Sequence, residues 1–264
     1  GEGGGKIRPD RRNRFVLSLE RGLRVAGIVP RATGWRVRMR NTIPLSRGMG
    51  SSASVTVAGL LAADAFAGGG VLGTDRILAL ATEAEGHPDN AAAVLLGGFV
   101  VVATIDGAPR AVRFDPPAEL RCILYIPDRP LATREMRAAL PATVPFKDAI
   151  HNVGASSLAV AAMASGRLDL LRSATIDRLH EPYRALPYPE LPRMTSAARA
   201  AGALGSALSG AGSSIIAFAG DDASAARVEA ALVEEAGLIG LAGRSTIVLP
   251  RRDGARVTVF EPSR

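Results

Sequence analysis

The sequence is short of cysteine and aromatic residues, and each scarcity excludes a class of protein. Its 264 residues include one cysteine and 4% aromatic side chains, against a formal net charge of +7. The single thiol, Cys122, excludes an internal disulfide, and the apolar run around it predicts that it is buried. Because so few rings are available to stack on bases, we expect no nucleic-acid partner despite the positive charge.

Long apolar runs are also missing. No uninterrupted run reaches the roughly 18–20 residues that a bilayer span requires, so we expect no membrane-spanning segment and no membrane partner. Residues 1–10 are polar and glycine-rich, and no signal peptide is visible there. A cytoplasmic protein is the simplest interpretation, and 264 residues suffice for one large domain or two closely associated ones.

Several common catalytic motifs are absent. A P-loop needs a lysine directly after its second glycine, but the only lysines, Lys6 and Lys147, lie in no such pattern. A dinucleotide-binding G-x-G-x-x-G fails because Ala53 occupies the place of the last glycine. No G-x-S-x-G occurs, so a serine hydrolase has no support.

What is present is a glycine- and serine-rich stretch from Pro44 to Ser54, followed by a run of small apolar residues. This order predicts a glycine turn and then a buried helix. The first N–H groups of a helix lack internal partners and carry partial positive charge. Gly48 and Gly50 leave room for an anion, so the stretch predicts a phosphate cradle. A serine cap after a glycine turn explains the same residues equally well.

A second polar cluster is Glu85-Gly86-His87-Pro88-Asp89-Asn90, where proline ends a helix and displays its neighbours in a loop. Glu85 is a suitable ligand for Mg²⁺, which prefers hard oxygen donors and keeps several waters. His87, Asp89 and Asn90 are suited to holding or deprotonating a polar substrate. The alternative is a hydrogen-bonded loop between two helices, and we favour a functional role over it.

Two arginines near helix ends and a glycine hinge are weaker signals. Arg137 and Arg184 each carry a guanidinium, which binds a carboxylate through two parallel N–H bonds. That chemistry suits an amino-acid substrate, although a surface ion pair is the commoner explanation. Residues 209–214 combine glycine and serine between two apolar runs. They fit a close approach to a ligand or to another loop, and a bulged hairpin turn equally well.

The periodicity of apolar residues, together with glycine and proline residues that end regular structure, predicts helices and strands along the whole chain. A change of pattern after Pro116-Pro117 predicts a domain boundary, with domains at residues 1–117 and 118–264. The expected helices are 10–23, 51–66, 75–85, 91–96, 133–140, 147–165, 168–183, 191–201 and 223–236. The expected strands are 35–40, a hairpin of 99–104 and 111–114, 121–126, the runs flanking 209–214, 245–249 and 256–260.

These motifs together resemble the GHMP small-molecule kinases. Residues 44–53 resemble the family's second motif, P-x-x-x-G-L-G-S-S-A, with Met49 in place of leucine. Residues 85–90, followed by Gly97-Gly98, are similar to the E-G-H-P-D-N…G-G signature of the homoserine kinases, one branch of the family. Leu208–Ser214 resembles the third motif, with serine where proline is usual. The similarity covers essentially the whole chain.

The resemblance implies the two-domain α+β fold of the GHMP kinases. Its N-terminal mixed α/β domain would be truncated here, and its C-terminal domain would be a ferredoxin-like α/β sandwich. The resemblance also implies phosphoryl transfer from ATP, with Mg²⁺, to the side-chain hydroxyl of L-homoserine in threonine biosynthesis. The implied partners are these small molecules and, in many members, a second copy in a homodimer.

The resemblance further implies roles for individual residues. Those around the ATP phosphates are Pro44, Ser46, Arg47, Gly48, Met49, Gly50, Ser51 and Ser52. Those near Mg²⁺ are Ser52 and Glu85. Those that hold homoserine are His87, Asn90, Arg137 and Arg184, the arginines through its carboxylate. Those that act in catalysis are Ser52, Glu85, Asp89 and Thr133. Phosphoryl transfer depends mainly on positioning and charge stabilisation, so a strong base is not required.

One family motif has no counterpart. The first motif, P-A-[ST]-x-A-N-L-G-P-G-F-D, supplies an Asn and an Asp to the substrate in other members, and nothing like it occurs in this sequence. We therefore expect the opening strands of the first domain to be absent, which would expose a sheet edge. Two alternatives to a homoserine kinase follow: a GHMP kinase for another small alcohol, and an inactive remnant that only binds ligand.

Overall fold

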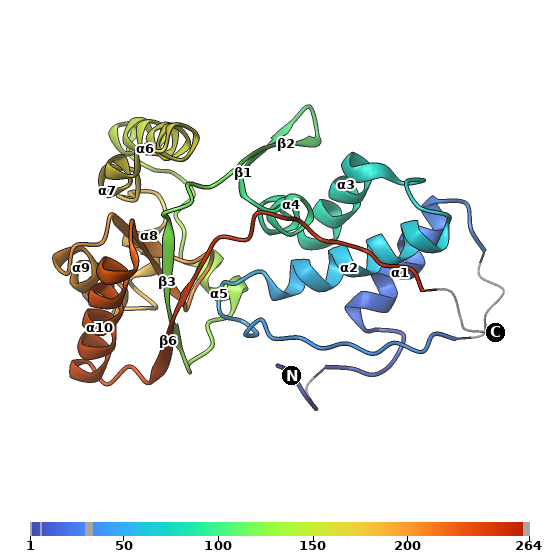
Figure 1. Ribbon diagram of the computed structural model, residues 1–264, viewed down its shortest axis with the longest axis horizontal. Helices are drawn as coiled ribbons and strands as arrows, with labels where there is room; N and C mark the ends of the chain where they lie inside the picture. Colours follow the sequence, from blue (N-terminus) through green and yellow to red (C-terminus); the bar gives the residue numbers. More distant parts are fainter. Residues whose placement is uncertain (1, 6, 30–33, 261–264) are drawn as a thin grey trace. The chain divides into compact units, whose positions relative to one another are not determined.

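The computed structural model describes residues 2–5, 7–29 and 34–260, which form two compact units (Figure 1). Unit 1 consists of Gly1–Pro44, Gly50–Arg113 and Arg251–Arg264, and unit 2 consists of Leu45–Met49 and Phe114–Pro250. The small first segment of unit 2 is the centre of the glycine- and serine-rich stretch, so that stretch is divided between the units. The predicted family domains, 1–117 and 118–264, stay a prediction.

Four helices make the core of unit 1. They are α1 (Arg14–Val25), α2 (Ser51–Phe66), α3 (Gly73–Glu85) and α4 (Asp89–Leu96). Most side chains of α2 are small and apolar, and they are distributed around the whole helix. This composition suits the central position of α2, because the other three helices all pack against it. Gly59 lets α1 approach, since an added Cβ would lie 2.5 Å from the Phe15 carbonyl oxygen. The predicted helix 51–66 is confirmed.

The remaining helices of unit 1 occur where they are predicted, with shifted starts. Helix α1 begins at Arg14 rather than at residue 10, because the Asn13 side chain caps it by accepting a hydrogen bond of 2.9 Å from the Phe15 N–H. Helix α4 begins at Asp89, two residues earlier than predicted. Asp89 and Asn90 therefore lie in the first turn of a helix, and their placement in a loop was wrong.

The two-stranded sheet of unit 1 confirms the predicted hairpin. Its strands are β1 (Phe99–Ile105) and β2 (Ala108–Phe114). Asp106 and Gly107 join them with φ angles of 51° and 76°. Positive φ at both central residues is the requirement of the type I′ turn, which matches the twist of the flanking strands.

Two predicted strands, 35–40 and 256–260, are wrong. Both segments are extended without pairing to any strand within the described part of the chain. Alternation marks a chain that can be a strand, but a strand also needs a partner for its N–H and C=O groups. Trp35 instead packs edge-on against Phe66, with ring centroids 5.7 Å apart. The Ala255 N–H donates to the Val94 carbonyl at the end of α4 at 2.9 Å.

Unit 2 is built on a four-stranded antiparallel sheet. Its strands are β3 (Arg121–Pro127), β4 (Gly205–Leu208), β5 (Ile215–Ala219) and β6 (Gly243–Val248), in the order β4-β5-β3-β6. Helices α9 (Leu191–Ala200) and α10 (Asp222–Leu238) pack against it (Figure 1). The chain order β-α-β-β-α-β with this strand order is the ferredoxin-like sandwich, so that prediction is confirmed.

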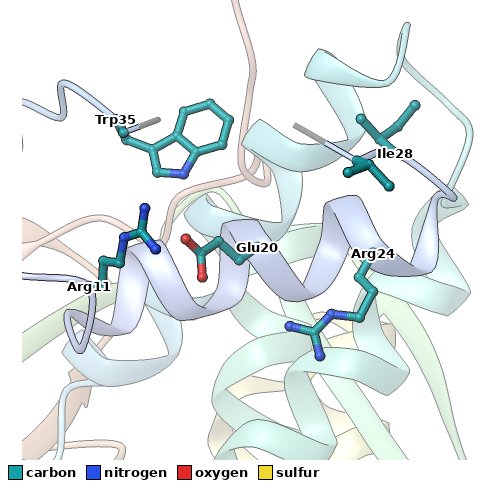
Figure 2. Close-up of a pocket in the computed structure, with 7 residues that line it drawn as sticks. Arg11, Glu20, Arg24, Ile28 and Trp35 are labelled. Carbon is teal, nitrogen blue, oxygen red and sulfur yellow. The ribbon is translucent and has the colours of Figure 1, made fainter. Parts of the chain in front are cut away.

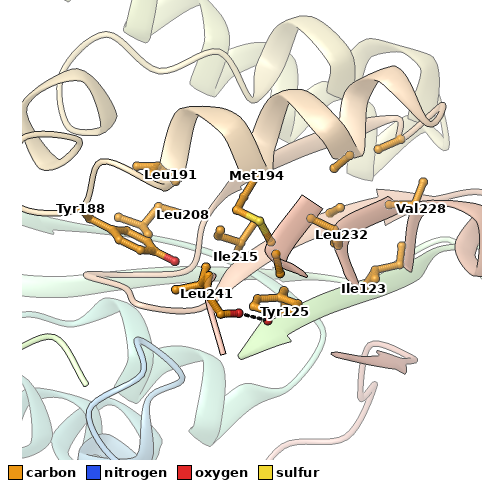
Figure 3. Packing of buried hydrophobic residues seen from close by; sticks show 14 of the residues in the cluster. Ile123, Tyr125, Tyr188, Leu191, Met194, Leu208, Ile215, Val228, Leu232 and Leu241 are labelled. Carbon is orange, nitrogen blue, oxygen red and sulfur yellow. Dashed lines mark hydrogen bonds between the residues drawn. The ribbon is translucent and has the colours of Figure 1, made fainter. Parts of the chain in front are cut away.

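The core of unit 2 lies between the sheet and these two helices (Figure 3). Strand β3 is buried from its second residue onward, as a strand in the interior of a covered sheet must be. The Tyr125 hydroxyl donates a hydrogen bond of 2.5 Å to the Leu241 carbonyl, which satisfies the polar end of a ring that is otherwise enclosed by apolar groups. Met194 and Leu232 fill the space between the helices and the sheet.

Between β3 and α9 the helices predicted at 133–140 and 147–165 are confirmed, but the helix predicted at 168–183 is not. The helices of this segment are α5 (Thr133–Ala138), α6 (Phe146–Ser165), the 3₁₀ turn η1 (Leu168–Leu170), α7 (Leu171–Ala174) and α8 (Glu181–Arg184). A single helix over 168–183 was wrong because the Asp177 carboxylate accepts hydrogen bonds from the N–H groups of residues 179, 180 and 181. Burial raises the pKa of Asp177, but these bonds and those from His180 and Asn152 outweigh it and hold the pKa well below its ordinary value.

In the described ranges, no helix combines the length and apolar character needed to cross a membrane.

Cys122 is a buried thiol, as predicted, with 8% of its surface exposed. Burial raises its pKa to about 11, so the reactive thiolate is scarce at neutral pH. We expect iodoacetamide to label the folded protein at pH 8 at least about tenfold more slowly than the urea-unfolded chain. Because the folded pKa lies above the unfolded one, this thiol lowers stability only as pH rises above about 9. Mass spectrometry measures the labelling rates. Equal rates for the folded protein and the unfolded chain would contradict the burial of Cys122.

Candidate active site

The start of α2 lies in unit 1 and begins with a bare turn. Gly50 is the residue before the helix, with φ 71° and ψ 17°, and no side chain caps the helix start. The Ser51 hydroxyl is buried and accepts a hydrogen bond of 3.2 Å from the Asn41 side-chain amide. Ser52 is exposed. The first N–H groups of α2 are therefore uncapped by side chains, at the end of a helix that carries partial positive charge.

Glu85, the last residue of α3, directs its carboxylate at the same helix. Its Oε1 accepts hydrogen bonds from the Ser52 hydroxyl at 3.1 Å and from the Thr56 hydroxyl at 2.7 Å. Arg14 of α1 donates to the same oxygen at 2.7 Å. Only 7% of the Glu85 side chain is exposed, so these donors compensate a charge that has been removed from water.

Asn90 completes the group in unit 1. A Cβ added to Gly50 would lie 3.1 Å from the Asn90 side-chain oxygen, so the Asn90 side chain lies directly beside the turn before α2. His87 contacts the Asp89 carboxylate through Nδ1, and Asp89 also accepts a hydrogen bond of 2.6 Å from the Asn90 N–H. The Asp89 carboxylate is thus already held by two donors at the start of α4.

The oxygen atoms of Glu85 and Ser52 have the chemistry that is needed to bind a Mg²⁺ ion in complex with a nucleotide. The carboxylate and the Ser52 hydroxyl are hard oxygen donors, and no hydrogen bond reaches Glu85 Oε2 from the residues that the structure describes. Those residues include no group of three or more His, Cys, Asp or Glu side chains that would hold a metal by themselves. Mg²⁺ bound to a nucleotide does not need one, because phosphates and waters supply most of its ligands.

The other part of the stretch, Leu45–Met49, packs within unit 2 against the loop between β4 and β5. A Cβ added to Gly48 would lie 2.0 Å from the Ser209 carbonyl oxygen and 2.8 Å from the Gly212 nitrogen. The Ser209 hydroxyl donates to the Gly48 carbonyl at 3.0 Å. Both interpretations offered for residues 209–214 hold, because these residues join the antiparallel neighbours β4 and β5 as a hairpin loop and also lie in close contact with Gly48.

Arg47 fixes this loop to the end of β3. Its guanidinium donates to the carbonyls of Pro127 at 2.6 Å and Leu45 at 3.0 Å, and also to that of Asp128. The Arg47 side chain is therefore engaged by backbone oxygens. Among the other residues predicted around ATP, Pro44 is buried, while Ser46 has a φ of 55° and accepts a hydrogen bond of 3.4 Å from the Leu131 N–H.

The two predicted carboxylate-binding arginines are neighbours within unit 2. Arg184, in α8, donates to the Gly210 carbonyl at 2.9 Å, while its Nε is buried without a partner in the described structure. Burial lowers the pKa of Arg184; nearby Asp177 raises it, and the positive charge of Arg137 lowers it again. Arg137 and Thr133 lie on α5 and are exposed.

The fold thus groups the predicted residues into separate sets. Gly50, Ser52, Glu85 and Asn90 converge in unit 1, whereas Gly48 meets the β4–β5 loop in unit 2, where Arg137 and Arg184 also lie. Two residues at this site, Thr56 and Arg14, were not indicated by the sequence motifs. Thr56 follows Ser52 by one helical turn, so helical spacing could have revealed it. Arg14 precedes Glu85 by 71 positions and carries no local signal.

Family models match both parts of the chain. The model for the N-terminal domain of GHMP kinases matches residues 14–98, and the model for the C-terminal part of GHMP kinases matches residues 159–237. The first match contains α2, Glu85 and Asn90, and the second contains Arg184 and the β4–β5 loop. Together with the two-domain α+β fold, these matches define the class of GHMP kinases.

Individual relatives narrow the class. A homoserine kinase of Streptomyces avermitilis is 40% identical over 255 residues, which cover 95% of this chain and 82% of the relative. One from Thermus thermophilus is 43% identical over 198 residues, 75% of this chain and 66% of the relative. The crystal structure of homoserine kinase from Cytophaga hutchinsonii has a TM-score of 0.83 and 28% identity, covering 96% of this chain and 81% of that one. The chain belongs to the homoserine kinase family of the GHMP kinases.

Proposed function

We propose that this protein transfers the γ-phosphoryl group of ATP to the side-chain hydroxyl of L-homoserine, a step toward threonine. The products are O-phospho-L-homoserine, ADP and a proton. The observation that carries the proposal is the convergence of Gly50, Ser52, Glu85 and Asn90 at the start of α2. The 40% identity to a homoserine kinase over 95% of the chain supports the same substrate.

The ATP phosphates would bind the turn that leads into α2. The uncapped N–H groups of its first turn and the helix dipole favour an anion there. Gly48, Met49 and Gly50 would contribute backbone N–H groups. Ser51 and Arg47 would stabilise the turn rather than contact the phosphates, because the Ser51 side chain is already hydrogen-bonded to Asn41 and the Arg47 side chain to backbone carbonyls. Pro44 and Ser46 would shape the approach to the turn.

Mg²⁺ would be held by Ser52 and Glu85 together with the phosphates, and when bound it would neutralise charge that develops on the transferred group. The chain's own part is to aim the two oxygens. The Thr56 hydroxyl fixes Oε1 of Glu85, and Oε2, which accepts no hydrogen bond from the described residues, is left for the ion.

L-Homoserine would be held at both of its ends. We assign its hydroxyl end to His87 and Asn90, with Asp89 orienting the His87 ring and Thr133 assisting in catalysis. We assign its carboxylate to Arg137 and Arg184, whose guanidinium groups suit bidentate binding. Because Asp89 is already bonded to two donors, positioning and charge stabilisation rather than a strong free base would drive the transfer.

Measurement of ADP release by this chain, with and without L-homoserine, tests the proposal. We expect release that requires both homoserine and Mg²⁺. A panel of small alcohols, including mevalonate, run in parallel would identify another GHMP substrate. Nucleotide binding without turnover on any of them would overturn the proposal and indicate a remnant. A homodimer and a cytoplasmic location belong to the same proposal, and sedimentation analysis tests the first.

Arg184→Ala should raise the KM for homoserine about ten- to hundredfold, because a charge-assisted hydrogen bond to a carboxylate contributes about 1.5–3 kcal/mol. The KM for ATP should change less than about twofold. Steady-state kinetics with each substrate varied in turn measures both values. Arg178→Ala is the control, because Arg178 lies six residues before Arg184 in the chain and is paired with Asp148. An equal rise in both KM values for Arg184→Ala would refute the carboxylate assignment.

A further inference from the structure

Arg14 and Glu85 each occupy the unfavourable end of a helix. Arg14 is the first residue of α1, where the helix dipole disfavours a cation, and the first turn of α1 contains no acidic residue. Glu85 is the last residue of α3, where the dipole disfavours an anion. The direct contact between them, 2.7 Å from Nη1 to Oε1, offsets both penalties at once. Each residue therefore lies at a helix end that disfavours its charge, and the ion pair compensates for both positions.

The environments of the two partners are unequal. The Arg14 side chain is 49% exposed, whereas the Glu85 side chain is 7% exposed. A guanidinium that is half in water can leave the contact at low cost, but a buried carboxylate cannot lose its counter-charge without a replacement. The structure thus pairs a fixed anion with a replaceable cation.

We propose that Arg14 is the resident counter-cation of Glu85, which neutralises this carboxylate in the nucleotide-free protein and competes with the divalent ion for it. The proposal rests on the proposed function, since it requires that the metal of a metal–nucleotide complex binds at Glu85. Arg14 acts through Glu85 and is therefore a positioning residue. Its presence weakens metal binding and protects the folded, metal-free state.

A second arginine pair provides a matched control. Arg21 of α1 contacts Glu83 of α3, so it joins the same two helices through the same chemistry. Both of its side chains are exposed, at 39% and 55%, and neither is among the residues assigned to the site. Loss of this pair tests what an ordinary surface ion pair between α1 and α3 contributes.

The experiment is a titration with Mn²⁺, a paramagnetic substitute for Mg²⁺, in the presence of a non-hydrolysable ATP analogue. Free Mn²⁺ is followed by electron paramagnetic resonance. We expect Arg14→Met to lower the Kd for Mn²⁺ about tenfold, because a competing positive charge has been removed. The melting temperature of the metal-free protein should fall, and that of the complex should fall less. Arg21→Met should leave the Mn²⁺ Kd unchanged.

Further variants separate the possible failures. Arg14→Lys keeps the charge but loses the planar fork, so its Kd should lie between those of the wild type and Arg14→Met; it also serves if Arg14→Met does not fold. An unchanged or raised Kd for both Arg14 variants would overturn the proposal while leaving the metal assignment intact. If Glu85→Gln bound Mn²⁺ as tightly as the wild type, the metal assignment itself would fail, and the role of Arg14 with it.

Discussion

Glu85→Gln should lower kcat by about two to three orders of magnitude, the effect of losing one major charge-stabilising group in an active site. Glutamine has nearly the same shape, and its carbonyl oxygen still accepts hydrogen bonds from Ser52 and Thr56. What it lacks is the negative charge that attracts the metal ion of the ATP complex. Homoserine-dependent ADP release at saturating substrates measures the effect.

The matched control is Glu83→Gln, two residues earlier on α3. Glu83 makes the same kind of contact with an arginine of α1, but its side chain is 55% exposed. Its replacement should change kcat by less than about twofold, because an exposed ion pair contributes little. If Glu85→Gln retained more than about a third of wild-type kcat under metal saturation, Glu85 would have no role as a metal ligand.

Gly48→Ala should destabilise unit 2 by about 3 kcal/mol or more, because two penalties add. Gly48 has a φ of 70°, a conformation that alanine adopts at a cost. The added Cβ would also lie 2.0 Å from the Ser209 carbonyl oxygen, so the loop joining β4 to β5 would have to move. Urea unfolding followed by circular dichroism measures the loss.

Gly166→Ala isolates the conformational part of that cost. Gly166, at the end of α6, has a φ of 73°, and nothing in the described structure lies within 4 Å of an added Cβ. Its replacement should therefore cost only about 1 kcal/mol. A similar loss for both variants would mean that the contact between Gly48 and the Ser209 backbone contributes nothing beyond the backbone conformation.

Local signals in the sequence were sufficient for most elements. The α2 helix follows from an apolar run that begins directly after a glycine turn, and the β1–β2 hairpin follows from Asp106-Gly107, which favours a type I′ turn. They were insufficient where a side chain from elsewhere decides the outcome. The Asp177 carboxylate breaks the predicted helix 168–183, and it is itself held by Asn152, 25 residues earlier.

The candidate site divides in the same way. The sequence predicted the glycine turn, Glu85 and the residues after it as chemistry-bearing groups, because residue type and spacing express that chemistry directly. It could not predict that Ser52 and Thr56 share one oxygen of Glu85 with Arg14. That arrangement depends on how α1, α2 and α3 pack, and packing brings together residues between which the sequence shows no pattern.

The sequence by itself was sufficient for the family motifs, most of the helices and the functional class. Each of these is expressed in the types and spacing of residues that are near neighbours in the chain. Tertiary structure alone decided that Arg47 is bonded to carbonyls near the end of β3, that Asp89 and Asn90 open a helix, and that 35–40 is not a strand. The physical reason is that a hydrogen-bonding group has its partner chosen by the folded chain around it, whereas its chemistry is fixed by residue type.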